Sequence, residues 1–253
     1  MKIFIKTATG FAWASFIACN LVLAQEKSPE AKPADDDPSA QPIVKPPKVE
    51  SVSPGVYRVA DHITLDLSKR EISFPAVSNQ VNGLVEYALV HETGKTHESL
   101  FRTKVSPRNL QAALLLARVR SAPGFVENLW KEDRLKMDVS ASKLSIVVSW
   151  TEKDKLRSSP LEKMATNSHS KKAIAIGSFI FNGSRFVGNV FMAEESGSIV
   201  AVYADDTAMI NSGDYDSNND DVWLAHKQTM PPLDHPVTFT LKFPPKKVPL
   251  DKR

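Results

Sequence analysis

The sequence has 253 residues, of which 42% are hydrophobic and 24% are charged. This composition is that of a globular protein, and it excludes collagen-like, fully disordered and polytopic membrane classes. The net charge is only +3 and the basic runs are short, the longest being pairs such as Lys171-Lys172, so we expect no nucleic-acid partner.

Residues 1–24 are predicted to be a secretory signal peptide. Lys2 and Lys6 supply a positive start, and residues 7–23 are almost uncharged and mostly apolar before the expected cleavage near Ala24. The chain is therefore expected to be secreted or periplasmic. The alternative is a membrane anchor that is retained.

The single cysteine, Cys19, lies inside this predicted signal peptide. Cleavage after Ala24 would leave a chain with no thiol, no disulfide and no iron–sulfur cluster. Phe16-Ile17-Ala18-Cys19 also resembles a lipoprotein processing site, so a lipid anchor at Cys19 is a second possibility.

Residues 25–53 are predicted to be a disordered linker. Residues 25–50 include six prolines and ten charged residues and have no apolar periodicity that could offset the entropy of ordering. We expect one folded domain over residues 54–245 and a basic tail over residues 246–253.

Two hairpins are predicted at the start of this domain. The alternation over 63–67 and 71–74 indicates two short strands, the second stopped by Pro75. Strands over 84–92 and 97–105 would be antiparallel around Gly94-Lys95, a glycine-first turn. That register would pair Glu92 with His97 and His91 with Glu98.

One main helix is predicted over about 106–120. Ser106 supplies a capping hydroxyl, Pro107 fits the first helical position, and apolar residues follow at helical spacing. Further short strands are indicated between 144 and 243, with no regular alternation of strand and helix. The expected fold class is therefore α+β, β-rich, with mostly antiparallel short strands and one main helix.

An acidic loop is the most specific local motif. Oxygen-bearing side chains recur at every second position, as in the first half of a calcium-binding loop, at Asp214, Asp216, Asn218 and Asp220. Asn219 replaces the usual glycine and Ala225 the closing carboxylate. The alternative is a polar surface loop whose side chains bond its own backbone.

Glu86, His97 and Glu98 are the candidate ligand-binding residues. Imidazole and carboxylate groups are good zinc ligands, although the same side chains could simply form cross-strand charge pairs. Glu86 interrupts an apolar strand. If buried, it would have a raised pKa and could act as a general acid or base, and otherwise it forms an ion pair.

The pattern of these segments resembles the YdjY domain family. The resemblance rests on Arg70-x-Ile72-x-Phe74-Pro75-Ala76, Gly83-x-x-Glu86-Tyr87-x-Leu89-Val90, Gly94-Lys95-x-His97-Glu98-Ser99-Leu100 and the 214–223 loop, within about residues 56–243. It implies a bacterial, mostly exported protein with no established activity. Some relatives carry ferredoxin-like cysteine motifs, which this chain lacks.

We therefore expect an exported, non-catalytic binding or envelope-associated module, with calcium as the one possible cofactor. The alternative is a metal-assisted hydrolase that uses Glu86 or Glu98 as the base. No hydrolase or phosphate-binding motif such as Gly-x-Ser-x-Gly is present in the sequence.

Overall fold

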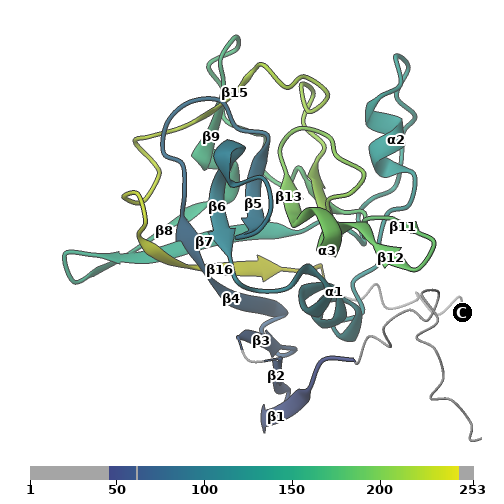
Figure 1. Ribbon diagram of the computed structural model, residues 1–253, viewed down its shortest axis with the longest axis vertical. Helices are drawn as coiled ribbons and strands as arrows, with labels where there is room; N and C mark the ends of the chain where they lie inside the picture. The colour runs from purple at the N-terminus through teal and green to yellow at the C-terminus, as the bar shows by residue number, and fades with distance from the viewer. Residues whose placement is uncertain (1–45, 61, 245–253) are drawn as a thin grey trace, which may run out of the picture. The chain divides into compact units, whose positions relative to one another are not determined.

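A computed structural model describes residues 46–60 and 62–244 (Figure 1). The predictions for the signal peptide, for Cys19 and for the basic tail lie outside these residues, as does most of the predicted linker. None of the helices within the described ranges has both the length and the apolar character needed to cross a membrane.

The expected fold class is confirmed, because the described domain is rich in short, mostly antiparallel strands and has one main helix. The helices are α1 (Pro107–Leu116), α2 (Phe125–Leu129) and α3 (Met192–Ser196), with 3-10 turns at η1 (Thr96–Glu98) and η2 (Leu161–Met164). The strands are β1 (Val49–Ser53), β2 (Val56–Val59), β3 (Ile63–Asp66), β4 (Glu71–Ser78), β5 (Tyr87–His91), β6 (Ser99–Thr103), β7 (Ser145–Glu152), β8 (Lys155–Pro160), β9 (Ala165–Asn167), β10 (Phe179–Phe181), β11 (Phe186–Val187), β12 (Val190–Phe191), β13 (Ser198–Ala201), β14 (Ile210–Ser212), β15 (Trp223–Ala225) and β16 (Pro236–Lys242).

The main sheet branches at β4 and almost closes on itself. One arm runs β4-β6-β5-β13-β14-β10, and the other runs from β4 through β16 to β7 and β8. The two arms meet again where Lys143 bridges Ile180 and the amide of Leu144 donates to the carbonyl of Phe179. The strands therefore form a ring, and the side chains that point into the ring become the core.

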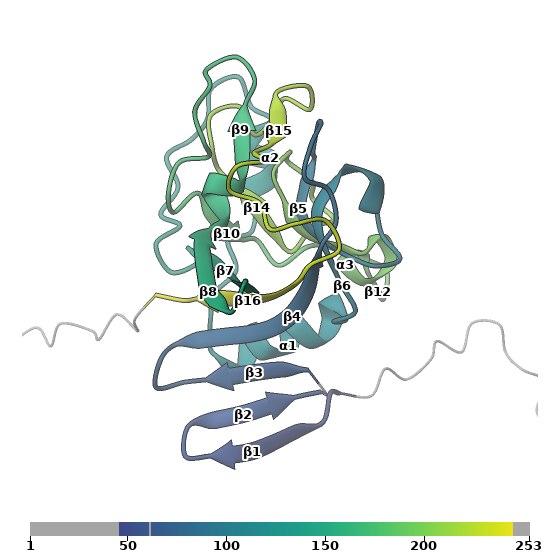
Figure 2. The same cartoon turned by 90° about the vertical axis from the view of Figure 1, so that its left-hand side faces the viewer.

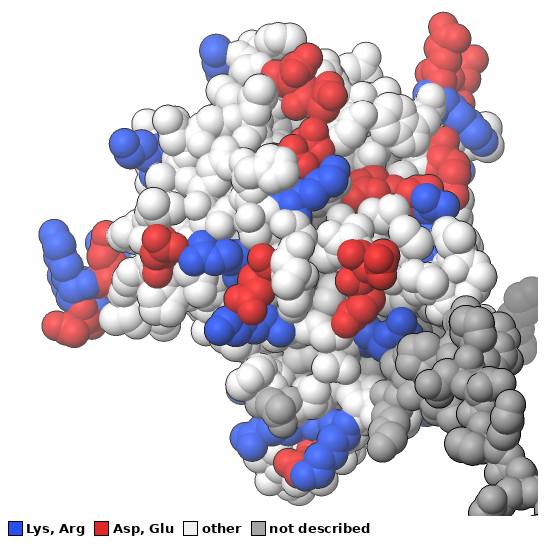
Figure 3. All heavy atoms as spheres, viewed as in Figure 1, with Lys and Arg blue, Asp and Glu red and all other residues white. Residues whose placement is uncertain are grey.

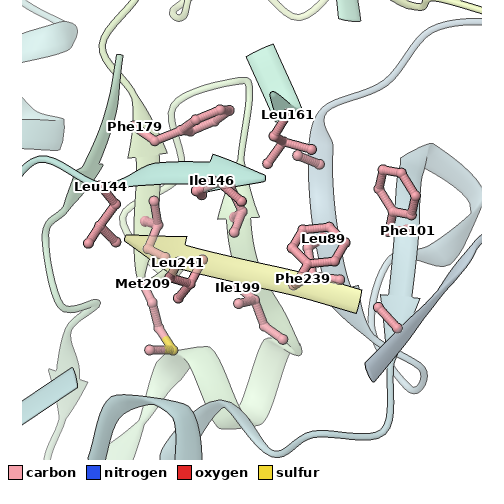
Figure 4. Close-up of a cluster of buried hydrophobic side chains, with 14 of the residues drawn as sticks. Leu89, Phe101, Leu144, Ile146, Leu161, Phe179, Ile199, Met209, Phe239 and Leu241 are labelled. Carbon is pink, nitrogen blue, oxygen red and sulfur yellow. The ribbon is translucent and has the colours of Figure 1, made fainter. Parts of the chain in front are cut away.

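This interior is filled by aliphatic and aromatic side chains (Figure 4). On β16, Val237, Phe239 and Leu241 are buried while Thr238 and Thr240 alternate with them, as a strand with one buried face requires. The ring of Phe239 stacks on Phe74 at 5.7 Å and meets Phe101 edge-on at 5.1 Å. These contacts join both arms of the sheet to one core.

Strand β1 corrects the predicted boundary of the linker. Residues 49–53 were expected to be disordered, but β1 pairs antiparallel with β2, and β1 to β4 follow one another across one end of the sheet (Figure 2). All five side chains of β1 are exposed. The strand is held through its backbone, so it leaves no apolar periodicity in the sequence.

Strand β4 does not stop at Pro75 as predicted but continues to Ser78. Proline lacks the N–H group that a central strand needs for its ladder. On one edge of β4 the pairing with β3 ends at Ser73 and the pairing with β6 begins at Val77, so Pro75 lies in the gap between them. Its carbonyl accepts a hydrogen bond from the Thr103 hydroxyl.

The predicted hairpin between 84–92 and 97–105 is wrong. Strands β5 and β6 are both present, but they are parallel, with Tyr87 opposite Ser99 and His91 opposite Thr103. Residues 92–98 return across the end of the sheet to the level at which β5 begins. The predicted pairs of Glu92 with His97 and His91 with Glu98 therefore do not form.

Helix α1 begins where the sequence predicted. The Ser106 hydroxyl accepts a hydrogen bond from the amide of Asn109, and Pro107 is the first helical residue. The helix ends at Leu116, four residues before the predicted end near 120, and Arg118 takes a positive φ of 59° just beyond it. A positive φ cannot continue a right-handed helix.

Candidate functional site

A cleft of about 300 Å³ lies beside the carboxyl end of β13, and we call it the Lys95 cleft. Four segments form its walls: the start of β5, the 92–98 connection, α2 and the loop after β13. Acidic side chains gather on this face of the molecule, around the region of β13 and α2 (Figure 3). The cleft is lined by Glu86, Tyr87, Lys95, Val126, Glu127, Trp130, Tyr203, Ala204, Asp205 and Asp206.

A chain of hydrogen bonds crosses the floor of the cleft. The Lys95 ammonium donates to the Tyr87 hydroxyl at 3.0 Å, and that hydroxyl donates to the Asp205 carboxylate at 2.9 Å. Asp205 also accepts hydrogen bonds from the amide and the hydroxyl of Thr207 at 2.8 and 2.7 Å. Because each group is held by the next, the polar side chains keep a fixed geometry.

Tyr87 and Lys95 both remain protonated at neutral pH. Burial of the Tyr87 phenol raises its pKa, and the nearby Asp205 carboxylate raises it further. Burial alone would lower the pKa of Lys95, but the hydrogen bond with Tyr87 and the charges of Glu98 and Glu86 outweigh it, so the pKa is raised. The floor therefore presents a permanent cation and a permanent hydroxyl.

Glu86 and Glu98 both form an ion pair with the Lys95 ammonium. The nitrogen is 3.8 Å from a carboxylate oxygen of Glu86 and 3.5 Å from one of Glu98, and the Glu86 amide donates to the Glu98 carbonyl at 2.9 Å. Burial raises the pKa of Glu86, the Glu98 charge adds to this, and Lys95 opposes it. Glu86 is half-buried and also pairs with Lys95, so the two alternatives considered for it are not exclusive, and its role in ligand binding stays a prediction.

An aromatic corner forms one wall of the cleft. The rings of Trp130 and Tyr203 meet at 90° with their centroids 5.5 Å apart. Trp130 follows α2 and is 48% exposed. The backbone amides of Val202 and Tyr203 both donate to the Glu86 carbonyl, which fixes this segment against the start of β5.

The structure brings two of the three predicted ligand-binding residues together. Glu86 lines the cleft and Glu98 adjoins it through Lys95. His97 points outward, with 79% of its side chain exposed and its Nε2 3.7 Å from Glu98. His91 instead contacts its own turn, where Nδ1 lies 2.8 Å from the Thr93 hydroxyl.

Two carboxylates of the acidic loop already accept hydrogen bonds from residues outside the loop. The Asp214 carboxylate accepts from the amide of Ala175 at 2.7 Å, and the Asp216 carboxylate accepts from the side chain of Asn167 at 2.7 Å. Within residues 46–60 and 62–244, no three His, Cys, Asp or Glu side chains gather in a way that could hold a metal ion. Calcium at Asp214, Asp216, Asn218 and Asp220 stays a prediction.

Sequence reasoning missed most of the cleft. Tyr87, Lys95 and Asp205 were not singled out for function, and neither were Trp130 or Tyr203. The one local signal was Trp130, a large aromatic residue directly before the charged run 131–134. Tyr87 and Asp205 are 118 residues apart in the chain, so only the folded sheet brings them together.

The fold and the cleft define a β-rich α+β domain with a small polar site at one end of its sheet. A family model described as the YdjY domain matches residues 63–242, and the chain belongs to that family. All residues of the Lys95 cleft lie inside the matched range, whereas β1 and β2 precede it. Searches of curated proteins and of solved structures found no match.

Proposed function

We propose that this protein is an exported, non-catalytic binding module that holds a small polar ligand in the Lys95 cleft. The observation that carries this proposal is the half-exposed Trp130 ring, which forms a corner with Tyr203 above a floor of fixed polar groups. Ligand sites in proteins commonly combine an aromatic wall with a few fixed polar side chains.

The protonation of the floor favours binding over catalysis. Proton transfer near neutral pH is most efficient for groups whose pKa lies near 7. The pKa values of Tyr87 and Lys95 are both raised, which moves the two groups further from that range. They therefore act as fixed hydrogen-bonding and charged groups that can orient a ligand.

Binding is tested by nuclear magnetic resonance of the Trp130 indole N–H, assigned with a Trp130→Phe variant. The probes are N-acetylglucosamine, succinate and choline, which are neutral, anionic and cationic. We expect a saturable shift of this signal with at least one of them. The absence of a saturable shift with all three contradicts the proposal.

Export is part of the same proposal and is supported by the positive start at Lys2 and Lys6 and the apolar segment 7–23. Intact mass of the protein recovered from outside the cytoplasm tests it, and we expect a chain that begins at Gln25. A lipid-bearing chain that begins at Cys19 would show that the protein is exported as a lipid-anchored protein and not as a soluble one. A full-length cytoplasmic product would contradict export.

A second candidate function is hydrolysis, and the observation that favours it is the raised pKa of Glu86 beside Glu98. Two neighbouring carboxyl groups in different environments are an arrangement that can serve as general acid and general base. Turnover of nitrophenyl ester or glycoside substrates, lost in Glu86→Gln and in Glu98→Gln, would support it. The absence of turnover by the wild-type protein would contradict hydrolysis and leave binding as the proposed function.

A further inference from the structure

We propose that the ligand of the Lys95 cleft carries an organic cation, an ammonium or guanidinium group, seated in the corner between Trp130 and Tyr203. This inference rests on the proposed binding function and names the ligand class. The two rings meet edge-to-face at a right angle, so a cation in the corner can lie on the face of one ring and within reach of the other. Contact of cations with aromatic faces is favourable, most of all with tryptophan.

The charges around the corner favour a cation as well. Lys95 is the one basic side chain among the residues that line the cleft, and it pairs with Glu86 and Glu98. Arg185 lies outside the cleft and pairs with Asp206 at 2.9 Å. The carboxylates at or beside the cleft outnumber them, namely Glu86, Glu98, Glu127, Asp205 and Asp206. The field in the cleft is therefore negative.

Asp205 has no cationic partner among the hydrogen bonds and ion pairs of the described residues. Its hydrogen-bond donors are the hydroxyl of Tyr87 and the amide and hydroxyl of Thr207, all of which are neutral. Neutral donors stabilise a carboxylate without cancelling its charge. Asp220 adds to the field, since its charge raises the pKa of both Glu86 and Tyr203.

An inorganic metal ion fits this site less well than an organic cation. Metal ions need several oxygen or nitrogen ligands that converge at about 2.0–2.6 Å, and the described part of the chain has no such group of three carboxylates or imidazoles. The aromatic corner would add nothing to the binding of a hydrated metal ion. An anion or a neutral sugar would meet the rings but would not gain from the negative field.

The test compares choline with dimethylbutanol, the neutral analogue in which carbon replaces the quaternary nitrogen. The two have the same shape, so the ratio of their dissociation constants isolates the contribution of the charge. We expect choline to bind about tenfold more tightly, and its affinity to fall as salt is added. Butylammonium and butanol form a second matched pair for a primary amine.

Two variants with matched controls locate the effect. Trp130→Leu is expected to lower choline affinity about tenfold, whereas Phe186→Leu, at another half-exposed aromatic outside the cleft, leaves it unchanged. Glu127→Gln is expected to weaken choline but not dimethylbutanol. Glu50→Gln, on β1 at the far end of the sheet, is the charge control.

The outcomes separate this inference from the proposed function. Equal affinity for choline and dimethylbutanol, or tighter binding of N-acetylglucosamine or succinate, overturns the cation class while the cleft remains a binding site. Choline binding that survives Trp130→Leu also overturns the inference. If no probe of any charge binds at Trp130, the proposed function itself fails.

Discussion

Gly94 and Gly197 approach each other so closely that a Cβ atom would clash with the backbone at Gly197 and would be crowded by it at Gly94. A Cβ on Gly197 would lie 2.8 Å from the Cα of Gly94, and one on Gly94 would lie 3.0 Å from the carbonyl oxygen of Ser196. This contact seats the 92–98 connection against the start of β13. Lys95 directly follows Gly94, so the contact between the two glycines positions the Lys95 ammonium in the cleft.

Replacing Gly197 with alanine is expected to be strongly destabilising. Its φ is +72°, which costs a residue with a side chain about 1 kcal/mol, and the new methyl group would collide with backbone. We expect the free energy of unfolding to fall by about 2–4 kcal/mol in urea denaturation. Gly188→Ala is the control, because Gly188 has a φ of +59° with open space around it. Equal losses in both variants would show that the close contact is unimportant.

Removing the Tyr87 hydroxyl is expected to break the hydrogen-bond chain that links Lys95 to Asp205. Tyr87→Phe deletes the group that accepts from Lys95 and donates to Asp205, so we expect a loss of about 1–2 kcal/mol in stability. Tyr57→Phe, in β2, is the matched control and is expected to change stability by less than about 0.5 kcal/mol. In a double-mutant cycle with Lys95→Met, additive effects would contradict a shared hydrogen-bond chain.

Glu86 makes the stability of the domain depend on pH. Its pKa is raised in the folded state, so the folded state favours the protonated carboxyl, and this contribution is lost as the pH rises through the folded pKa. Glu86→Gln has no such loss, so its Tm should exceed that of the wild type by about 1–3 °C at neutral pH, with the difference shrinking in acid. A Tm difference that does not vary with pH would contradict this assignment.

Local patterns predicted the helix start at Ser106 and the strand-rich class, since both depend on neighbouring residues. They failed for β5 and β6, because Gly94-Lys95 has the signature of a tight hairpin turn while Gly94 is in fact needed for contact with Gly197. The cleft was missed because it, too, depends on contacts between residues that are distant in the sequence. Glu86 could be marked as unusual within its own strand, but the residues around it come from the 92–98 connection, from α2 and from the segment after β13.

The calcium prediction for the 214–220 loop can be checked with a thermal melt. A ligand that binds only the folded state raises the Tm with its concentration, so we expect a rise with added Ca²⁺ that a chelator reverses. Asp220→Asn should abolish the rise. Asp216→Asn is less informative, because Asp216 also holds Asn167. An identical Tm in calcium and in chelator would rule out a calcium site in this loop.

Glu194 of α3 completes the amino-terminal cap of α1. Its carboxylate accepts from the Ser106 hydroxyl at 2.9 Å and from the amide of Arg108 at 2.9 Å, and a carboxylate at this end of a helix is favourable. Glu194→Ala is expected to cost about 1 kcal/mol of stability, as is Ser106→Ala. Because the two side chains share one cap, the double variant should lose less than the sum. Glu195→Ala, at the next position of α3, which is also exposed, is the control, and a loss equal to that of Glu194→Ala would show that the cap contributes nothing.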